Sequence, residues 1–358
     1  MNILHLGNPY FLQELRRLGH DVKWAAHDRT ADLPLRRPLE SVQGILSRSA
    51  PWTPDFILLG DDSTQPAVLG LESLAVPLVW YAIDSHLHAN WHQYYASVFD
   101  VIFVAQKDWE RLYRVDADRQ TVSWQPLFCR AQDDHRLGLV RDIPLSFIGT
   151  LNPAWNPRRV KLIQDIQARY PIVIESGPYL KTFNRSMMVL NQSAAGDLNF
   201  RTFQAMACGT FLLTERVGNG FDELFQDGLH CASYDAGNVD QVIELVEYYR
   251  RHPCQREAVA ERGYQAVMAA HTSMHRAEVI VNAVATGNVS DAIAKRRSRQ
   301  LQIQWCLASV YESSARKCLQ AAQRMTEESK RHYFGGVAEQ YQFLAATIRR
   351  QLTPLLAA

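Results

Sequence analysis

The sequence contains little that could cross-link the chain through disulfides or metal ions. Its six cysteines, at positions 129, 208, 231, 254, 306 and 318, form no C-x-x-C pair and show no paired spacing with histidines. Neither a disulfide framework nor a structural zinc site is therefore indicated. Reduced thiols, as in a cytoplasmic protein, are the expectation.

A charge excess and long apolar runs are missing as well. The formal net charge of the 358 residues is +1, so electrostatics gives no reason to expect a nucleic-acid partner. No stretch approaches 18 apolar residues and the start lacks a signal-peptide pattern, so no transmembrane segment is expected. At 47% hydrophobic residues, the chain can instead bury the cores of two domains and carry an appendage.

Residues 1–128 have the pattern of an α/β domain. Short apolar runs alternate with helical or loop segments and occupy residues 2–7, 21–26, 55–59, 77–83, 101–105 and 121–124. Continuous apolar strands of this kind indicate a parallel sheet covered on both faces. Gly7 ends the first run, but no G-x-G-x-x-G follows it, so the fingerprint of a dinucleotide-binding site is absent.

A second α/β series covers residues 142–290, after a polar linker at 130–142. Its expected strands include 145–149, 172–174, 187–190 and 231–234, and its expected helices include 158–170, 240–251, 255–270 and 274–285. The sequence thus predicts an α/β protein with two Rossmann-like domains.

Residues 291–358 predict an antiparallel pair of helices with one apolar stripe each. Two helices cannot bury both stripes alone, so we expect them to dock onto the second domain, with self-association or a protein partner as the alternatives. The basic cluster Lys295, Arg296, Arg297 and Arg299 is interpreted as a solvated helix start, or else as a contact for anionic lipid or an acidic partner.

The segment after the strand at 187–190 carries the most specific chemistry. Asp197 is placed to cap a helix that Gly209 ends, and Asp197, Arg201, Gln204 and Cys208 form one polar stripe along it. A helix that begins at the carboxyl end of a parallel strand directs its free N–H groups at the crevice where such sheets bind ligands. Arg201, one turn in, would strengthen the binding of a diphosphate there. A solvated arginine on an amphipathic helix is the alternative.

The stretch "GDLNFRTFQAMACGTFLLTERVGNGFDELFQDGLH" at 196–230 resembles the nucleotide-sugar-binding segment of GT-B glycosyltransferases. It is most similar to the CgeB-like (spore maturation protein) group and more distantly similar to glycosyltransferase family 4. Weaker similarity is found at 147–163 and 15–22, and none covers the last 65 or so residues. The resemblance implies a GT-B fold, in which two Rossmann-like domains face each other across a cleft, here with the helical C-terminal extension added.

The resemblance also implies donor-binding positions. Arg201 corresponds to the family's arginine near the donor phosphates, and Gln204 stands where the family has a glutamate that binds the ribose hydroxyls. An amide offers one acceptor oxygen where a carboxylate offers two, so Gln204→Glu should bind donor at least as tightly as the natural chain. The remaining expected donor contacts are Gly149, Thr150, Arg158, Asn199, Thr202, Gly218 and Gly220. No cofactor beyond the nucleotide sugar is expected, and GT-B enzymes usually bind diphosphate without a metal.

The acceptor is expected in the first domain. The segment "YAIDSHLHANWH" at 81–92 ends a strand and carries Asp84, His86, His88 and His92. A histidine or aspartate here could take the acceptor hydroxyl proton, because imidazole titrates near working pH. Metal binding by the H-x-H pair and an ordinary polar loop are the alternatives.

The sequence therefore predicts a glycosyltransferase that moves a sugar from a nucleotide sugar to a glycan, protein or small molecule. Two alternatives stay open. One is a GT-B-shaped binding or scaffolding module without turnover, which the Gln204 departure favours. The other is a sugar-nucleotide epimerase, which would need no acceptor.

Overall fold

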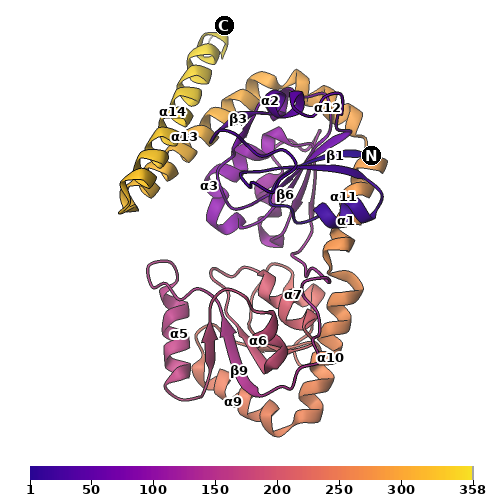
Figure 1. The fold of residues 1–358 in the computed structure, drawn as a ribbon, viewed down its shortest axis with the longest axis vertical. Coiled ribbons are helices and arrows are strands. Elements are labelled where there is room, and N and C mark those ends of the chain that lie inside the picture. The colour runs from indigo at the N-terminus through magenta and orange to yellow at the C-terminus, as the bar shows by residue number, and fades with distance from the viewer. Residues whose placement is uncertain (357–358) are drawn as a thin grey trace. The chain divides into compact units, whose positions relative to one another are not determined.

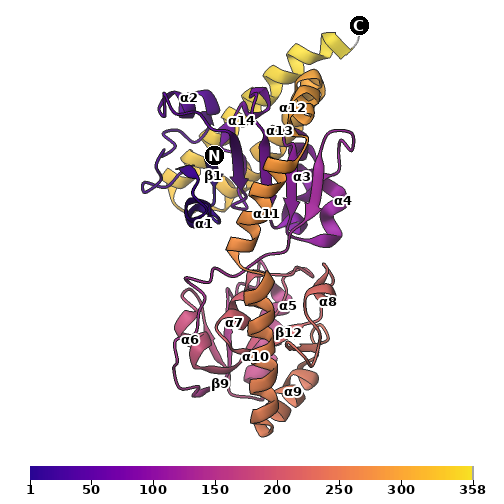
Figure 2. The same cartoon turned by 90° about the vertical axis from the view of Figure 1, so that its right-hand side faces the viewer.

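The computed structural model describes residues 1–356, and these divide into two compact units with separate cores. The first unit comprises Met1–Ala105, Trp109–Gln125 and the chain from Ala277 onwards, and the second comprises Gln106–Asp108 and Pro126–Arg276. Figure 1 and Figure 2 show each unit as a sheet with helices packed against it.

The first unit is built on a six-stranded, wholly parallel sheet in the order β2-β1-β4-β6-β7-β8. Its strands are β1 (Asn2–Gly7), β2 (Asp21–Ala25), β4 (Phe56–Gly60), β6 (Leu78–Ala82), β7 (Val101–Val104) and β8 (Thr121–Trp124). A small sheet pairs β3 (Glu40–Ser41) with β5 (Val68–Leu69). The helices are α1 (Leu12–Arg17), α2 (Val42–Ser47), α3 (Ser85–Tyr95), α4 (Glu110–Tyr113), α12 (Val289–Ser298), α13 (Gln300–Arg324) and α14 (Glu328–Leu356).

The second unit has a five-stranded parallel sheet in the order β10-β9-β11-β12-β13. Its strands are β9 (Ile143–Ile148), β10 (Val173–Glu175), β11 (Ser186–Asn191), β12 (Phe211–Glu215) and β13 (Ala232–Tyr234). The helices are α5 (Pro157–Gln167), α6 (Leu180–Arg185), α7 (Phe200–Ala207), α8 (Phe221–Leu224), α9 (Val239–Arg251) and α10 (Pro253–Ala270), and α11 (Ser273–Thr286) leads into the first unit.

In both sheets, the direction in which the chain adds strands reverses at the first strand. From β1 the chain moves outward to β2 and then returns past β1 to β4, and β9, β10 and β11 repeat this order. The connections at such a point leave in opposite directions, so a crevice opens at the carboxyl ends of the strands. Each unit therefore has one built-in place for a ligand.

The C-terminal helices pack on the first unit, so the expectation that they dock onto the second domain was wrong. Apolar side chains of α13 and α14, including Leu307, Tyr311 and Tyr341, belong to the first unit's core. Asn90 on α3 donates a hydrogen bond to the Ser313 hydroxyl at 2.8 Å, and the Tyr341 hydroxyl donates one to the Pro66 carbonyl at 3.0 Å. Figure 1 shows α13 and α14 as two long helices side by side.

The basic cluster that precedes α13 is also not a solvated helix start. Arg296 is fully buried in an ion pair with Asp100 and also donates to the Leu74 and Val76 carbonyl oxygens at 2.6 and 2.9 Å. Arg299 pairs with Asp116, and Lys295 pairs with Asp291. Three of the four basic residues thus hold α12 against the first sheet or stabilise the helix itself. Among the described helices, none is both long and apolar enough to cross a membrane.

Candidate functional site

A pocket of about 320 Å³ opens in the second unit where β9 and β10 end. Side chains and backbone from β9, α5, the segment after β10, α6 and α7 line it: Ile148, Gly149, Thr150, Arg159, Gly177, Tyr179, Phe183, Arg201 and Gln204. We call it the arginine pocket. It lies at the point where the strand order reverses, which is the position where doubly wound sheets bind ligands.

Two guanidinium groups give this pocket its charge. Arg201 and Arg159 lie over the Phe147 ring, at 5.5 and 5.8 Å from its centroid. Arg201 donates a long hydrogen bond of 3.4 Å to the Asn191 side-chain oxygen, and Arg159 donates to the Gln192 side-chain oxygen at 2.9 Å. In the part of the chain that the structure describes, neither arginine has a carboxylate within 4 Å.

Burial and mutual repulsion both act on these arginines. Desolvation, followed by the charge of Arg159, lowers the pKa of Arg201 to about 10, and Asp197 partly offsets this. Desolvation also lowers the pKa of Arg159. Two desolvated cations without an ion-pair partner are costly, and a bound anion would remove that cost. The arginine pocket is therefore suited to an anionic ligand.

Gly149 allows Arg201 to take this position. A Cβ atom on Gly149 would lie 3.0 Å from Nη2 of Arg201 and 3.0 Å from the Phe147 ring. Both distances are shorter than normal van der Waals contacts, so a larger residue would displace the guanidinium. The glycine that ends the first strand of this unit thus keeps the arginine close to the backbone.

Gln204 belongs to a hydrogen-bond chain at the side of the pocket. Its amide nitrogen donates to the Tyr179 hydroxyl at 2.7 Å, and that hydroxyl donates to Asp134 at 2.5 Å. Asp134 is buried, which raises its carboxyl pKa. Desolvation and then the Asp134 charge raise the pKa of the Tyr179 hydroxyl as well, so it stays protonated.

The structure brings four of the expected donor contacts into the arginine pocket: Gly149, Thr150, Arg201 and Gln204. Arg158 lies outside its lining, with a side chain that is 64% exposed and ion-paired to Glu215 at 3.3 Å. Thr202 is buried and accepts a hydrogen bond from Asn191 at 3.1 Å.

The expectation that Asp197 caps α7 was wrong, because Asn199 occupies the capping position. The Asp197 carboxylate instead accepts hydrogen bonds from Ser193, Ala194 and Ala195 and so closes the loop before the helix. Asn199 makes no side-chain cap, and its amide oxygen is buried without a partner among residues 1–356. Gly209 ends the helix with a φ of 67°, as expected.

Gly218 and Gly220 belong to a loop and are not among the residues that line the arginine pocket. The neighbouring Asn219 exchanges hydrogen bonds with Asp108, at 3.0 and 3.2 Å, and donates to the Gly196 carbonyl at 2.7 Å. A Cβ atom on Gly218 would lie 2.8 Å from the Asp108 carboxylate. This loop is thus closed by contacts within the second unit.

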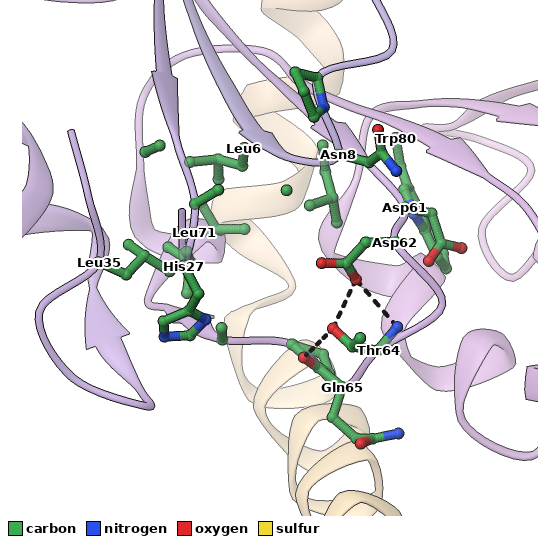
Figure 3. Close-up of a pocket in the computed structure, with 18 of the residues that line it drawn as sticks. Leu6, Asn8, His27, Leu35, Asp61, Asp62, Thr64, Gln65, Leu71 and Trp80 are labelled. Carbon is green, nitrogen blue, oxygen red and sulfur yellow. Dashed lines mark hydrogen bonds between the residues drawn. The ribbon is translucent and has the colours of Figure 1, made fainter. Parts of the chain in front are cut away.

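A second pocket, of about 290 Å³, opens at the corresponding point of the first unit. We call it the aspartate pocket, because Asp28, Asp61 and Asp62 are in its lining, where β2 and β4 end. Figure 3 shows Asp62 hydrogen-bonded to Thr64 and Asp61 beside Trp80, with His27 and Leu35 across from them. Trp24, Trp91 and Tyr95 complete its aromatic part.

The expected acceptor histidines lie on α3 rather than in a loop, and neither His86 nor His88 is in the lining of the aspartate pocket. Lys317 on α13 approaches Nδ1 of His88 to 2.7 Å. A protonated Lys317 donates to Nδ1, which leaves the ring hydrogen on Nε2. Burial and the Lys317 charge lower the pKa of His88 to about 4, so the ring is neutral. In this state His88 is a hydrogen-bond donor through Nε2 rather than a base.

Asp84 and His92 also belong to α3 and its start. Asp84 precedes α3 with a φ of 50° and accepts a hydrogen bond from Ser63, whose φ is 62°. Backbone in this region is strained for such residues, and strain of this kind concentrates at functional sites. His92 is fully buried, with Nε2 at 3.6 Å from Asp61 and Nδ1 at 2.7 Å from the Tyr113 hydroxyl. Across residues 1–356 no three histidine, cysteine, aspartate or glutamate side chains form a metal-binding group.

Sequence reasoning missed Arg159, Tyr179, Asp61 and Lys317. Asp61 had a recognisable signal, because it follows a buried strand at the same sheet edge as Asp84. Arg159 is adjacent to Arg158, which the sequence analysis named as a donor contact. Tyr179 and Lys317 had no signal, since both reach their partners only through the tertiary fold.

Residues 127–282 match the family model described as Glycosyl transferase-like. This glycosyltransferase-like segment covers less than half of the chain and contains every residue in the lining of the arginine pocket. A comparison with curated proteins found no relative that matches this chain.

Solved structures of glycosyltransferases share the fold over most of the chain. A glycosyltransferase from Rickettsia africae has a TM-score of 0.60 at 10% identity and covers 80% of this chain and 99% of its own. HepE of Anabaena, crystallised with UDP and glucose, has a TM-score of 0.60 at 11% identity and covers 80% of this chain and 100% of its own. Sucrose-phosphate synthase of Thermosynechococcus elongatus has a TM-score of 0.57 at 10% identity and covers 80% of this chain and 100% of its own. The chain therefore has the GT-B fold, as its sequence predicted, with helices added at the C-terminus.

Proposed function

We propose that this protein is a glycosyltransferase that binds a nucleotide-sugar donor in the arginine pocket and transfers its sugar to an acceptor held by the first unit. The observation that carries the proposal is the pair Arg159 and Arg201, two desolvated guanidinium groups without a carboxylate partner in the described chain. The glycosyltransferase-like segment around them and the UDP-bound HepE structure of the same fold support a nucleoside diphosphate as the anion.

The arginines would act mainly on the leaving group. Sugar transfer leaves a nucleoside diphosphate with more negative charge than it had in the donor, and fixed cations stabilise that charge as it develops. Each charge-assisted hydrogen bond from a desolvated guanidinium is worth roughly 1.5 to 3 kcal/mol. No carboxylate is among the residues in the pocket lining, so the ligands that Mg²⁺ prefers are missing from it. We therefore propose binding and transfer without a metal.

The direct test is isothermal titration calorimetry of UDP with the Arg201→Ala variant, repeated in the presence of EDTA. We expect at least a tenfold loss of affinity, equivalent to about 1.4 kcal/mol, with thermal unfolding little changed and with no effect of EDTA on the natural chain. Lys161→Ala is the control, because its side chain is 77% exposed and paired with Asp165 on the same helix. Equal affinity of the natural chain and Arg201→Ala would refute the assignment.

For the acceptor we propose catalytic contacts by Asp84, His86 and His88. The strained backbone at Asp84 and the buried position of His88 support a functional role. Alanine variants of these three residues should lower turnover without lowering UDP affinity. We further assign the chain to the CgeB-like group, on the sequence pattern at 196–230.

A binding module without turnover is the second candidate function. The Gln204 side chain favours it, because its amide is committed to Tyr179 and offers no carboxylate for the ribose hydroxyls. Hydrolysis of UDP-glucose in the absence of an acceptor separates the two functions. A transferase releases UDP slowly under these conditions, whereas a binding module retains intact donor.

A further inference from the structure

The aspartate pocket carries the opposite charge to the arginine pocket. Asp28, Asp61 and Asp62 are in its lining, and no lysine or arginine is among the lining residues. His27 is the one histidine in the lining. Its Nε2 donates a hydrogen bond of 2.9 Å to the Arg37 carbonyl oxygen. Burial raises the pKa of the Asp61 carboxyl well above its ordinary value, so the negative charge comes from Asp28 and Asp62. An anionic ligand would meet these two carboxylates without a strong cation to offset them.

Two of the carboxylates keep capacity for a ligand. Oδ1 of Asp62 accepts from the Thr64 hydroxyl at 2.6 Å, and Oδ1 of Asp28 accepts from the Thr30 hydroxyl at 2.7 Å. Their second oxygens have no hydrogen-bond or ion-pair partner within the described chain. Asp61 differs, because both of its oxygens accept backbone N–H groups, from Ser63 at 2.9 Å and Ile83 at 3.0 Å.

The lining of the pocket also contains unused hydrogen-bond donors. The indole nitrogens of Trp80 and Trp91 have no acceptor among residues 1–356, although these side chains are only 1% and 2% exposed. Buried donors of this kind normally find a partner, because leaving one unpaired costs about 1 to 3 kcal/mol. Both nitrogen atoms have almost no accessible surface, however, so a ligand in the pocket does not reach them and the proposal does not rest on them.

We propose that the aspartate pocket binds the acceptor, and that the part it binds is a polyhydroxylated group without negative charge, such as a neutral or amine-bearing sugar. A sugar hydroxyl donates to a carboxylate, so a polyhydroxylated group matches the second oxygens of Asp28 and Asp62. The cavity of about 290 Å³ is at the lower end of small-molecule sites, which suits a single sugar unit. This substrate class rests on the proposed glycosyl transfer, but the binding itself does not require a donor.

The experiment is saturation-transfer difference NMR on the full-length chain, without donor, using glucose, glucosamine, glucuronic acid and glucose 6-phosphate at pH 7. We expect saturable binding of the first two and at least tenfold weaker binding of the two anions. Binding of an anion as tightly as glucose, or no binding by any of the four sugars, would overturn the proposal.

The Asp62→Asn variant tests whether the sugars bind in the aspartate pocket. The asparagine oxygen can still accept from Thr64, so the loop should keep its fold, while the negative charge is lost. We expect severalfold weaker glucosamine binding and a smaller penalty for glucuronic acid. Asp118→Asn, at a side chain that is 81% exposed, should leave all four sugars unchanged. Identical behaviour of the two variants would place the sugars elsewhere. UDP affinity, measured in parallel, reports on the proposed donor site independently.

Discussion

Two adjacent arginines on α5 have different surroundings. Arg159 is in the lining of the arginine pocket and donates to Gln192, whereas Arg158 is largely exposed and paired with Glu215. Consecutive helical residues point about 100° apart, so only one of them can face the pocket. The Asn156 side chain caps the helix by accepting from the Arg159 backbone N–H at 3.0 Å, which sets this phase.

These surroundings give a matched pair of variants. Arg159→Met should weaken UDP binding about tenfold or more, because a desolvated cation facing the anion is lost. Arg158→Met should change UDP affinity less than about threefold, since an exposed ion pair contributes little. Calorimetry on both variants checks this, and a larger effect from Arg158 would show that the donor lies on the outer side of α5.

Gln204 gives a second residue-scale prediction, and the structure adds a cost to the Gln204→Glu substitution that the sequence could not show. The Tyr179 hydroxyl has one proton, which it donates to Asp134, so a glutamate at 204 would find no donor there. The repulsion should raise the pKa of the new carboxyl in the folded state. Such a group binds its proton more tightly when folded, so the variant loses stability as pH rises above the unfolded value of about 4.3.

Denaturant unfolding at several pH values measures this cost. At pH 8 we expect Gln204→Glu to lower the unfolding free energy by about 1 to 3 kcal/mol, and the loss should vanish near pH 4. Gln204→Met removes the same hydrogen bond without adding a charge, so its effect should not vary with pH. A pH-independent loss in the glutamate variant would contradict the hydrogen-bond chain. Its donor affinity, expected from the sequence to be at least that of the natural chain, can be measured on the same sample.

The residues of the site differ in how far the sequence could predict them. Gly149 and Arg201 follow strands at the sheet edge where ligands bind, so pattern and position were sufficient. Arg159 required the phase of α5, and Tyr179 lies between β10 and α6 without any periodic signal. Lys317 is 229 positions from His88, and only the packing of α13 on α3 brings them together.

At the scale of elements, a buried ion pair is among the contacts that hold α12 to the first unit. Arg296 and Asp100 are both fully buried, and Arg119 contacts Asp100 at 3.2 Å from the other side. The helical stripes of α13 and α14 predicted a pair of helices correctly. They could not specify which unit the pair packs on, because an apolar stripe does not identify its partner. The buried pair of Arg296 with Asp100 joins α12 to the first unit, but the sequence presented Arg296 only as one member of a basic run.

Arg296→Met is the test of this anchoring. Removing one partner of a buried ion pair typically costs about 3 to 5 kcal/mol, and the remaining Arg119 contact should place this variant near the lower value. Arg297→Met, one residue further along α12 and exposed, should cost less than about 0.5 kcal/mol. Denaturant unfolding measures both. Equal stability of the two variants would mean that the Arg296–Asp100 pair does not anchor α12.

At the scale of the whole molecule, the sequence predicted both parallel sheets because nearly every strand is a continuous apolar run between helical segments. Each sheet reverses at its first strand and opens one pocket there, and the two pockets differ in charge. The difference could not be read from the net charge of +1, since it arises from which few charged side chains the fold leaves unpaired. A donor with a diphosphate and an acceptor without negative charge match this division.

The difference in charge between the two pockets predicts which backbone segments each ligand protects from hydrogen exchange. UDP at a hundred times its dissociation constant should stabilise the unit that binds it by about 2.7 kcal/mol. Hydrogen-exchange mass spectrometry should then show slower exchange in residues 148–163, 177–183 and 200–207, which surround the arginine pocket, while the strands of the first unit exchange as before. Glucosamine should instead protect residues 24–28 and 61–68 around the aspartate pocket. The Arg201→Ala variant should lose the UDP effect and keep the glucosamine effect. If UDP protected the first unit alone, the assignment of donor and acceptor to the two units would have to be exchanged, because a diphosphate would then be bound among carboxylates.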